Sequence, residues 1–143
     1  MRLLISACLL GACCRYDGAS KGHPLARRLA ERYTLVPVCP EQLGGLATPR
    51  SPSERQGERV VAKNGTDVTE QYRRGAEEAR KLCRLLGCEA AVLKERSPSC
   101  GSGQIYDGTF TGTLIPGDGV TAELLKAEGI PVYGESQISK LLE

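Results

Sequence analysis

Three of the seven cysteines follow short apolar segments of the chain; they are Cys8, Cys39 and Cys100. They are separated by 31 and 61 residues, so only the folded chain can bring them together. Thiolate sulfur is a soft ligand that favours zinc, copper(I) or iron–sulfur clusters. The single histidine, His23, excludes a zinc site with two histidine ligands and any mechanism that needs two histidines. The pattern therefore indicates thiolate ligands or nucleophiles, although chance placement also explains three cysteines at such positions.

The remaining cysteines have different settings. Cys83 falls on the apolar face of an expected helix, where free cysteine acts as a small hydrophobic residue, and Cys88 precedes a strand at the edge opposite Cys100. Cys13 and Cys14 are ambiguous, since their loop can bring either one back toward Cys8. An odd number of cysteines leaves one thiol outside any complete set of disulfides, which favours a reducing compartment.

Polar residues close to these cysteines are candidates for catalysis and binding. Glu41, two residues after Cys39, is the best-placed general base, or alternatively a loop carboxylate that accepts backbone amides. Ser97 is a candidate for orienting substrate or water, and Ser99 and Arg50 are candidates for binding substrate. Each also has an ordinary structural interpretation, as turn chemistry beside Pro98 or as a loop ion pair.

The chain has 143 residues, the usual size of one domain, and we expect residues 1–143 to form a single compact unit. Apolar runs alternate with segments of helical periodicity, which predicts an α/β fold. The expected architecture is a short, mostly parallel, Rossmann-like sheet with helices on both faces. Strands are expected at 3–7, 34–38, 90–93 and 130–133, and helices at 23–32, 69–86, 121–128 and 136–142, the last one capped by Ser136.

Three further features follow from this pattern. Pro37 lacks a backbone donor, so its strand should be short or lie at an edge. Residues 40–65 are rich in proline and glycine and are expected to be a functional or mobile loop, with only brief pairing near residues 58–62. Residues 1–14 resemble a short export signal superficially, but a single Arg and an interrupted apolar run favour a buried first strand.

Composition excludes several classes of function. A net charge of +2 gives no support for nucleic acid or a membrane surface as a partner, and no apolar run is long enough to span a bilayer. Five Tyr, one Phe and no Trp argue against stacking platforms for bases. We expect a cytoplasmic protein, and the sequence does not predict its oligomeric state.

Several motifs occur in the order found in one bacterial family. They lie at residues 6–11 (SACLLG), 14–18 (CRYDG), 39–41 (CPE), 44–46 (GGL), 49–50 (PR), 97–101 (SPSCG) and 105–108 (IYDG). The chain thus resembles domain-of-unknown-function family 523, whose characterised members are thiouracil desulfidases. The resemblance covers nearly the whole chain.

The resemblance implies a [4Fe–4S] cluster held by three cysteines and non-redox removal of sulfur from a thiolated pyrimidine, giving uracil and sulfide from thiouracil. It carries the ligands over to Cys8, Cys39 and Cys100, and the open iron would bind the substrate sulfur. The main alternative is a non-catalytic zinc- or cluster-binding structural module. A thiol redox protein and an enzyme acting on thiolated RNA are further alternatives, which the absence of a CxxC pair and the near-neutral charge make less attractive.

Overall fold

The computed structural model describes residues 1–143 and contains a four-stranded sheet in the order β2-β1-β5-β8. Every neighbouring pair in this sheet is parallel. The middle of β1 (Leu3, Leu4 and Ile5) and the whole of β5 consist of small or branched apolar residues and are buried, as expected for strands covered on both faces. Pro37 lies in β2, an edge strand, as predicted. The strand bounds are β1 Arg2–Ser6, β2 Thr34–Val38, β5 Ala90–Leu93 and β8 Val132–Gly134.

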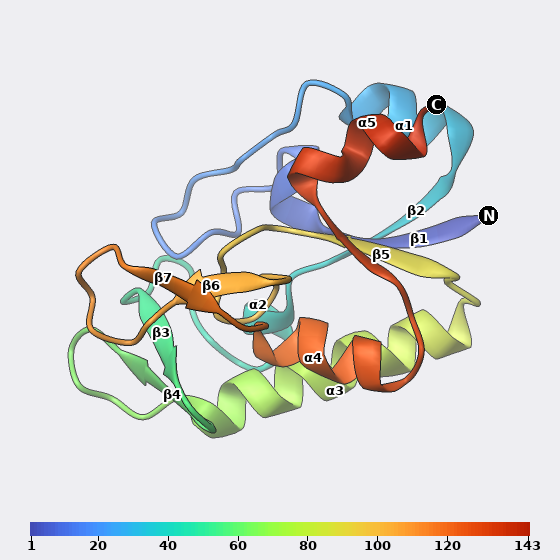
Figure 1. The fold of residues 1–143 in the computed structure, drawn as a ribbon. Coiled ribbons are helices and arrows are strands. Elements are labelled where there is room, and N and C mark those ends of the chain that lie inside the picture. Colours follow the sequence, from blue (N-terminus) through green and yellow to red (C-terminus); the bar gives the residue numbers. More distant parts are fainter.

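Alternate residues of β1 pack against helices on opposite faces of the sheet. Leu3 and Ile5 contact the side of α1 (Ala26–Arg32) and α5 (Ile138–Leu141), where Leu29 and Ile138 are fully buried. Leu4 contacts the side of α3 (Thr69–Leu85) and α4 (Val120–Ala127). Figure 1 shows the two pairs of helices above and below the sheet. The predicted α/β architecture is confirmed.

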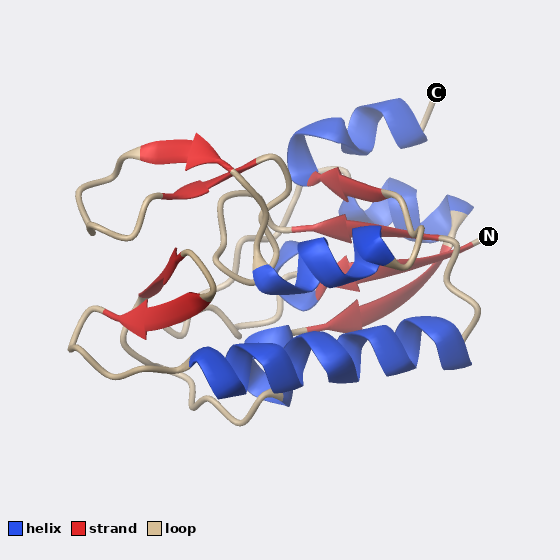
Figure 2. Cartoon of the chain, turned by 60° about the horizontal axis from the view of Figure 1, so that its bottom comes forward, coloured by secondary structure: helices blue, strands red, loops and turns tan.

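Two hairpins and a short helix lie beyond the carboxyl ends of the parallel strands; the pairing predicted near residues 58–62 is confirmed as part of the first hairpin, whereas the second hairpin and the helix were not expected. The hairpins pair β3 (Ser53–Gln56) with β4 (Arg59–Ala62) and β6 (Gln104–Tyr106) with β7 (Leu114–Pro116). The helix is α2 (Pro40–Leu43). Figure 2 shows both hairpins gathered at one end of the molecule, away from the N-terminus. The segment 40–65 is therefore loop-rich, as predicted, but also carries a short helix and a hairpin.

Element ends also differ from the predicted ones. The helix expected from residue 23 begins at Ala26. The last helix begins at Ile138 after a 3₁₀ turn (η2, Glu135–Gln137), so Ser136 does not cap it. Instead, Ser136 donates its hydroxyl proton to Glu95. No helix of the protein has both the length and the apolar character needed to cross a membrane.

Helices α2 and α3 are in direct backbone contact through two glycines. A Cβ on Gly75 would lie 1.9 Å from the carbonyl oxygen of Pro40, and one on Gly44 would lie 1.9 Å from that of Gln71. Both neighbours are backbone atoms that cannot rotate away. The contact fixes α2, and with it Cys39 and Glu41 at its start, to the longest helix of the fold.

We expect Gly75→Ala to destabilise the protein even though Ala is the better helix former. Helix propensity alone would favour Ala by about 1 kcal/mol, whereas forcing a methyl group into this contact should cost roughly 1–3 kcal/mol. Urea unfolding should therefore show a lower midpoint with an unchanged slope. Arg74→Ala, at the adjacent exposed position, is the matched control and should leave the midpoint nearly unchanged. An unchanged or higher midpoint for Gly75→Ala would show that α2 can move away.

Candidate functional site

A cavity of about 530 Å³ lies at the carboxyl edge of the parallel sheet. Strands β1, β2 and β5 end at this edge, and the segments that follow them line the cavity, as is general for open parallel sheets. The hairpin strands β3 and β6 contribute to its mouth. Six of the predicted site residues line the cavity: Cys8, Cys39, Glu41, Arg50, Ser97 and Cys100.

The three predicted ligands reach the cavity from three different local structures. Cys8 lies in a 3₁₀ turn directly after β1 (η1, Ala7–Leu10) and is 7% exposed. Cys39 occupies the position before α2, at the end of β2. Cys100 lies in the loop after β5 and is 5% exposed. Only the tertiary fold brings these positions together.

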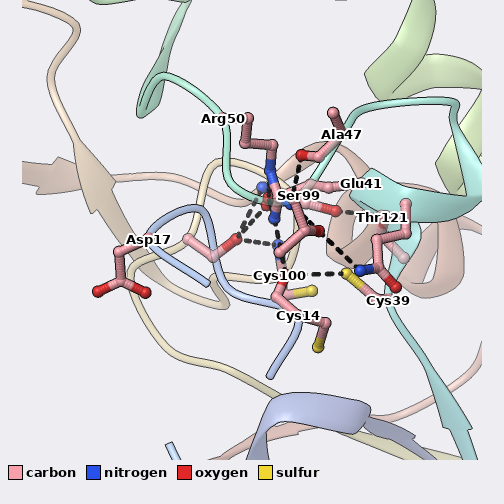
Figure 3. A network of polar contacts seen from close by, with 12 residues as sticks. Cys14, Asp17, Cys39, Glu41, Ala47, Arg50, Ser99, Cys100 and Thr121 are labelled. Atoms are coloured by element: carbon pink, nitrogen blue, oxygen red, sulfur yellow. Dashed lines mark hydrogen bonds and ion pairs between the residues drawn. The ribbon is translucent and has the colours of Figure 1, made fainter. Parts of the chain in front are cut away.

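Cys14 is a fourth thiol at the cavity, which resolves the ambiguity between Cys13 and Cys14. Cys14 is buried and lines the cavity, and its carbonyl oxygen lies 3.7 Å from the Sγ of Cys39. Cys13 is exposed and does not line the cavity. Cys83 and Cys88 also lie outside it: Cys83 belongs to the core between the sheet and α3 and α4, and Cys88 packs against that core. Figure 3 shows Cys14, Cys39 and Cys100 close to the pair formed by Arg50 and Glu41.

Burial favours the protonated form of three cavity thiols, those of Cys8, Cys14 and Cys100. It raises the pKa of Cys8 to about 11 and that of Cys100 to about 12. Burial, together with the neighbouring Cys39 and Cys8, raises the pKa of Cys14 to about 12. A metal that binds here must displace protons, as is general for thiolate sites.

The lining of the cavity is nevertheless basic. It contains six basic side chains and only three acidic ones, and Lys94 and Arg15 partly offset the effect of burial on the pKa of Cys8. The positive surroundings favour bound thiolates and other negative charge over neutral groups. The basic side chains are Arg15, Lys21, Arg50, Lys63, Lys94 and Arg96.

Glu41 and Arg50 form a buried ion pair at the wall of the cavity. Their side chains are only 14% and 8% exposed. Arg50 Nε donates to Glu41 Oε2 at 2.9 Å, and Arg50 Nη2 contacts the same oxygen. Although burial acts in the opposite direction, the Glu41 carboxylate raises the pKa of Arg50 above its usual value. The other oxygen, Oε1, is not engaged by Arg50 and lies 3.5 Å from the hydroxyl of Ser97.

All the donors of Arg50 are used within the protein. Besides Glu41, the guanidinium donates to the carbonyl oxygen of Ala47 at 3.2 Å, to Thr48 Oγ1 at 3.1 Å and to the carbonyl oxygen of Cys14 at 3.0 Å. A guanidinium has five N–H donors, and these contacts account for them. These contacts hold Glu41 and the Cys14 loop in place, while Arg50 also lines the cavity, where the sequence predicted a substrate contact.

Ser97 organises the loop that carries Cys100. Its Oγ accepts hydrogen bonds from the backbone N–H groups of Ser99 and Cys100, both at 3.1 Å. Since both lone pairs are engaged, the hydroxyl proton is free to be donated toward Glu41 or toward a ligand in the cavity. Ser97 is thus both a cavity group and a support for Cys100.

Ser99 faces away from the cavity, which differs from the expected substrate contact. It is 1% exposed, does not line the cavity, and its Oγ lies 2.9 Å from Thr121 Oγ1 at the start of α4. The backbone N–H groups of Thr121 and Ala122 donate to its carbonyl oxygen. Ser99 therefore joins the Cys100 loop to α4.

The thiols are arranged around a space rather than around a point. No three Cys, His, Asp or Glu side chains are grouped closely enough to hold one metal ion. Four cysteines instead face a shared cavity. A group with several metal atoms, each of which takes a different thiolate, fits this arrangement.

Comparison with known proteins identifies close relatives over nearly the whole chain. The family described as 2-thiouracil desulfurase matches residues 3–137. The uncharacterized protein YbbK of Bacillus subtilis is 42% identical, over 98% of this chain and 99% of the relative. A solved structure of the [4Fe–4S]-dependent thiouracil desulfidase TudS is 49% identical and superposes with a TM-score of 0.93, over 98% of this chain and 94% of that one.

Proposed function

Because the chain belongs to the 2-thiouracil desulfurase family, we propose that it is a non-redox desulfidase that replaces the sulfur of a thiolated pyrimidine by oxygen from water. The reaction converts C=S and H₂O into C=O and H₂S and needs no oxidant or reductant. The observation that carries the proposal is one cavity that holds three thiols from three strand ends together with a carboxylate. Residues 1–143 act as one domain, and the cofactor is a [4Fe–4S] cluster, as named for the TudS structure.

The donor set at the cavity fits such a cluster. Cys8, Cys39 and Cys100 offer three soft sulfur ligands, and the basic lining compensates for their negative charge. Three protein ligands leave one iron without a protein ligand, and when bound the cluster supplies this iron as a Lewis acid for the soft thiocarbonyl sulfur. Cys14 lies in the same cavity and is not needed in this ligand set.

Glu41 is the group that accepts a proton from the attacking water. Arg50 holds Oε2 and fixes the carboxylate, so Oε1 remains as the proton acceptor facing the cavity. The N–H donors of Arg50 are already used, so the pair positions the base without competing for the substrate. Ser97 donates its hydroxyl proton to the same oxygen or to the water and so orients the nucleophile. The chain's own residues thereby supply proton transfer and positioning.

Anaerobic reconstitution tests the proposal directly. We expect broad brown visible absorption, about four iron and four acid-labile sulfide per chain, and conversion of 2-thiouracil to uracil with release of one sulfide per turnover. The readouts are the visible spectrum, metal analysis and chromatography of the products. A colourless protein that contains zinc and converts no thiouracil would instead identify the structural module. Given the seven free thiols, the cluster is expected to be stable only in a reducing, cytoplasmic compartment.

A further inference from the structure

Aromatic side chains are rare in the chain but concentrated at the cavity. The sequence contains five Tyr and one Phe. Three of the tyrosines and the single phenylalanine line the cavity: Tyr16, Tyr72, Tyr106 and Phe110. The composition argued against a stacking platform, but composition says nothing about placement. Four of the six aromatic side chains of the chain therefore line one site.

Phe110 is held in an unusual backbone conformation. Its φ is 60°, and only one other non-glycine residue of the chain, Arg96, has a positive φ. Both residues line the cavity. A bulky residue in this region is strained, and strain of this kind persists where the surrounding structure enforces it, often at ligand-binding sites.

The neighbouring hairpin enforces the conformation of Phe110. Glu54 in β3 accepts the backbone N–H of Gly108 at 3.0 Å and that of Phe110 at 3.1 Å, both at Oε1. Gln56 donates to the carbonyl oxygen of Gly108 at 2.9 Å. Gly108 has a φ of 95°, and a Cβ there would lie 2.6 Å from Gln56 Cγ. One carboxylate oxygen thus holds the loop between β6 and β7 against β3.

Part of the apolar surface of Phe110 is not covered by the protein. Phe110 is half-buried although it belongs to none of the hydrophobic cores of the fold. Packing of the protein therefore does not explain why a strained position carries the only phenylalanine. A flat aromatic ligand in the cavity would cover the exposed part of the ring, and aromatic stacking contributes binding energy beyond the buried area.

We propose that Phe110 is a specificity-determining residue that stacks on the flat face of the heterocycle, and that Glu54 is the positioning residue that fixes it there. The inference rests on the proposed function, since it assumes a pyrimidine ring in this cavity. It predicts that recognition of the ring is separate from recognition of its sulfur, because Phe110 belongs to the loop between β6 and β7, whereas the thiols and Glu41 follow strands of the parallel sheet. Uracil, which lacks the sulfur, should therefore depend on Phe110 as strongly as thiouracil does.

The first test measures binding of uracil and turnover of 2-thiouracil by the cluster-loaded enzyme. Phe110→Leu, which keeps an apolar side chain but removes the ring, should raise the Kd for uracil, measured by calorimetry, by roughly tenfold or more. It should raise KM for 2-thiouracil to a similar extent with a much smaller change in kcat. Phe110→Tyr, which keeps the ring, should restore both values. Ile115→Thr is the matched control, since Ile115 lies on the same hairpin outside the cavity and should change neither.

The second test links Glu54 to Phe110. Glu54→Ala should raise the Kd for uracil, whereas Glu54→Gln, which keeps a side-chain oxygen as acceptor, should retain most of the affinity. If Glu54 acts through Phe110, Glu54→Ala should add little further loss in the Phe110→Leu background. Independent, additive losses would overturn the positioning role.

The outcomes separate this inference from the proposed function. An enzyme that turns over 2-thiouracil with the same KM in the wild type and in Phe110→Leu would overturn the stacking role and leave the desulfidase proposal intact. A wild type that binds uracil through Phe110 but releases no sulfide would support stacking and overturn the desulfidase proposal.

Discussion

Cys39→Ser is expected to reduce the iron content of the reconstituted protein to background and to abolish desulfuration. A serine oxygen is a much poorer ligand for cluster iron than a thiolate. No small movement of the chain can bring another ligand to this position. Cys39 directly precedes α2, and the contacts of Gly44 and Gly75 hold α2 against α3. Cys8→Ser and Cys100→Ser should have the same effect. The measurement is iron and acid-labile sulfide per chain after anaerobic reconstitution.

The other cysteines provide matched controls for this prediction. Cys13→Ser changes an exposed thiol outside the cavity and should leave the iron content unchanged, as should Cys88→Ser. Cys14→Ser is the informative case, because Cys14 is buried in the same cavity. A set of three ligands predicts normal iron content for this variant. Full iron content in Cys39→Ser would refute the assignment of ligands.

Glu41→Gln should retain the cluster and lose turnover by about a hundredfold or more, the usual contribution of a positioned general base. The amide keeps the size of the side chain but cannot accept a proton from water. In the proposed mechanism the carboxylate would take no part in binding the substrate sulfur, so 2-thiouracil should still perturb the visible spectrum of the inactive variant. The measurements are kcat, iron content and the spectral change on adding substrate.

Two comparisons keep this prediction specific. Removing the charge of Glu41 leaves Arg50 buried without its partner, so the thermal midpoint of Glu41→Gln must be measured beside its activity. Asp17→Asn is the control for a nearby carboxylate, since Asp17 accepts the backbone N–H of Ala19 and does not line the cavity. A fully active Glu41→Gln enzyme would mean that another group activates the water.

The parallel sheet was predictable because its strands are short apolar runs. Residues 90–93 consist of Ala, Val and Leu, and such an uninterrupted apolar run identifies a strand covered on both faces from the sequence alone. In the structure every one of these residues is buried. The hairpin strand β3 has the sequence SERQ and carries no apolar alternation. It forms because β4 pairs with it and because Glu54 and Arg55 find partners in distant loops. Only the tertiary structure contains that information.

The candidate site likewise has features that could be predicted from the sequence and features that could not. The positions of Cys8, Cys39 and Cys100 follow from the rule that parallel strands end at one edge, so their convergence was predictable. Cys14 was not, because its loop has no periodic pattern. The hydrogen-bond partners of Arg50 and Ser99 could not be predicted from the sequence either, because they depend on which groups the fold brings within reach of the two side chains. Phe110 was missed because a count of aromatic residues does not show where they gather.

The order of the strands has a consequence for the life of the protein in the cell. Strand β1 pairs with β5, so that Leu3 lies beside Ala90, and this long-range pairing brings Cys100 to the same cavity as Cys8. Contacts so distant in sequence form slowly compared with local ones. While the chain emerges from the ribosome, Cys8 and Cys39 are present long before their third partner. If the proposed cluster is held by Cys8, Cys39 and Cys100 together, its assembly on all three ligands must follow the pairing of β1 with β5.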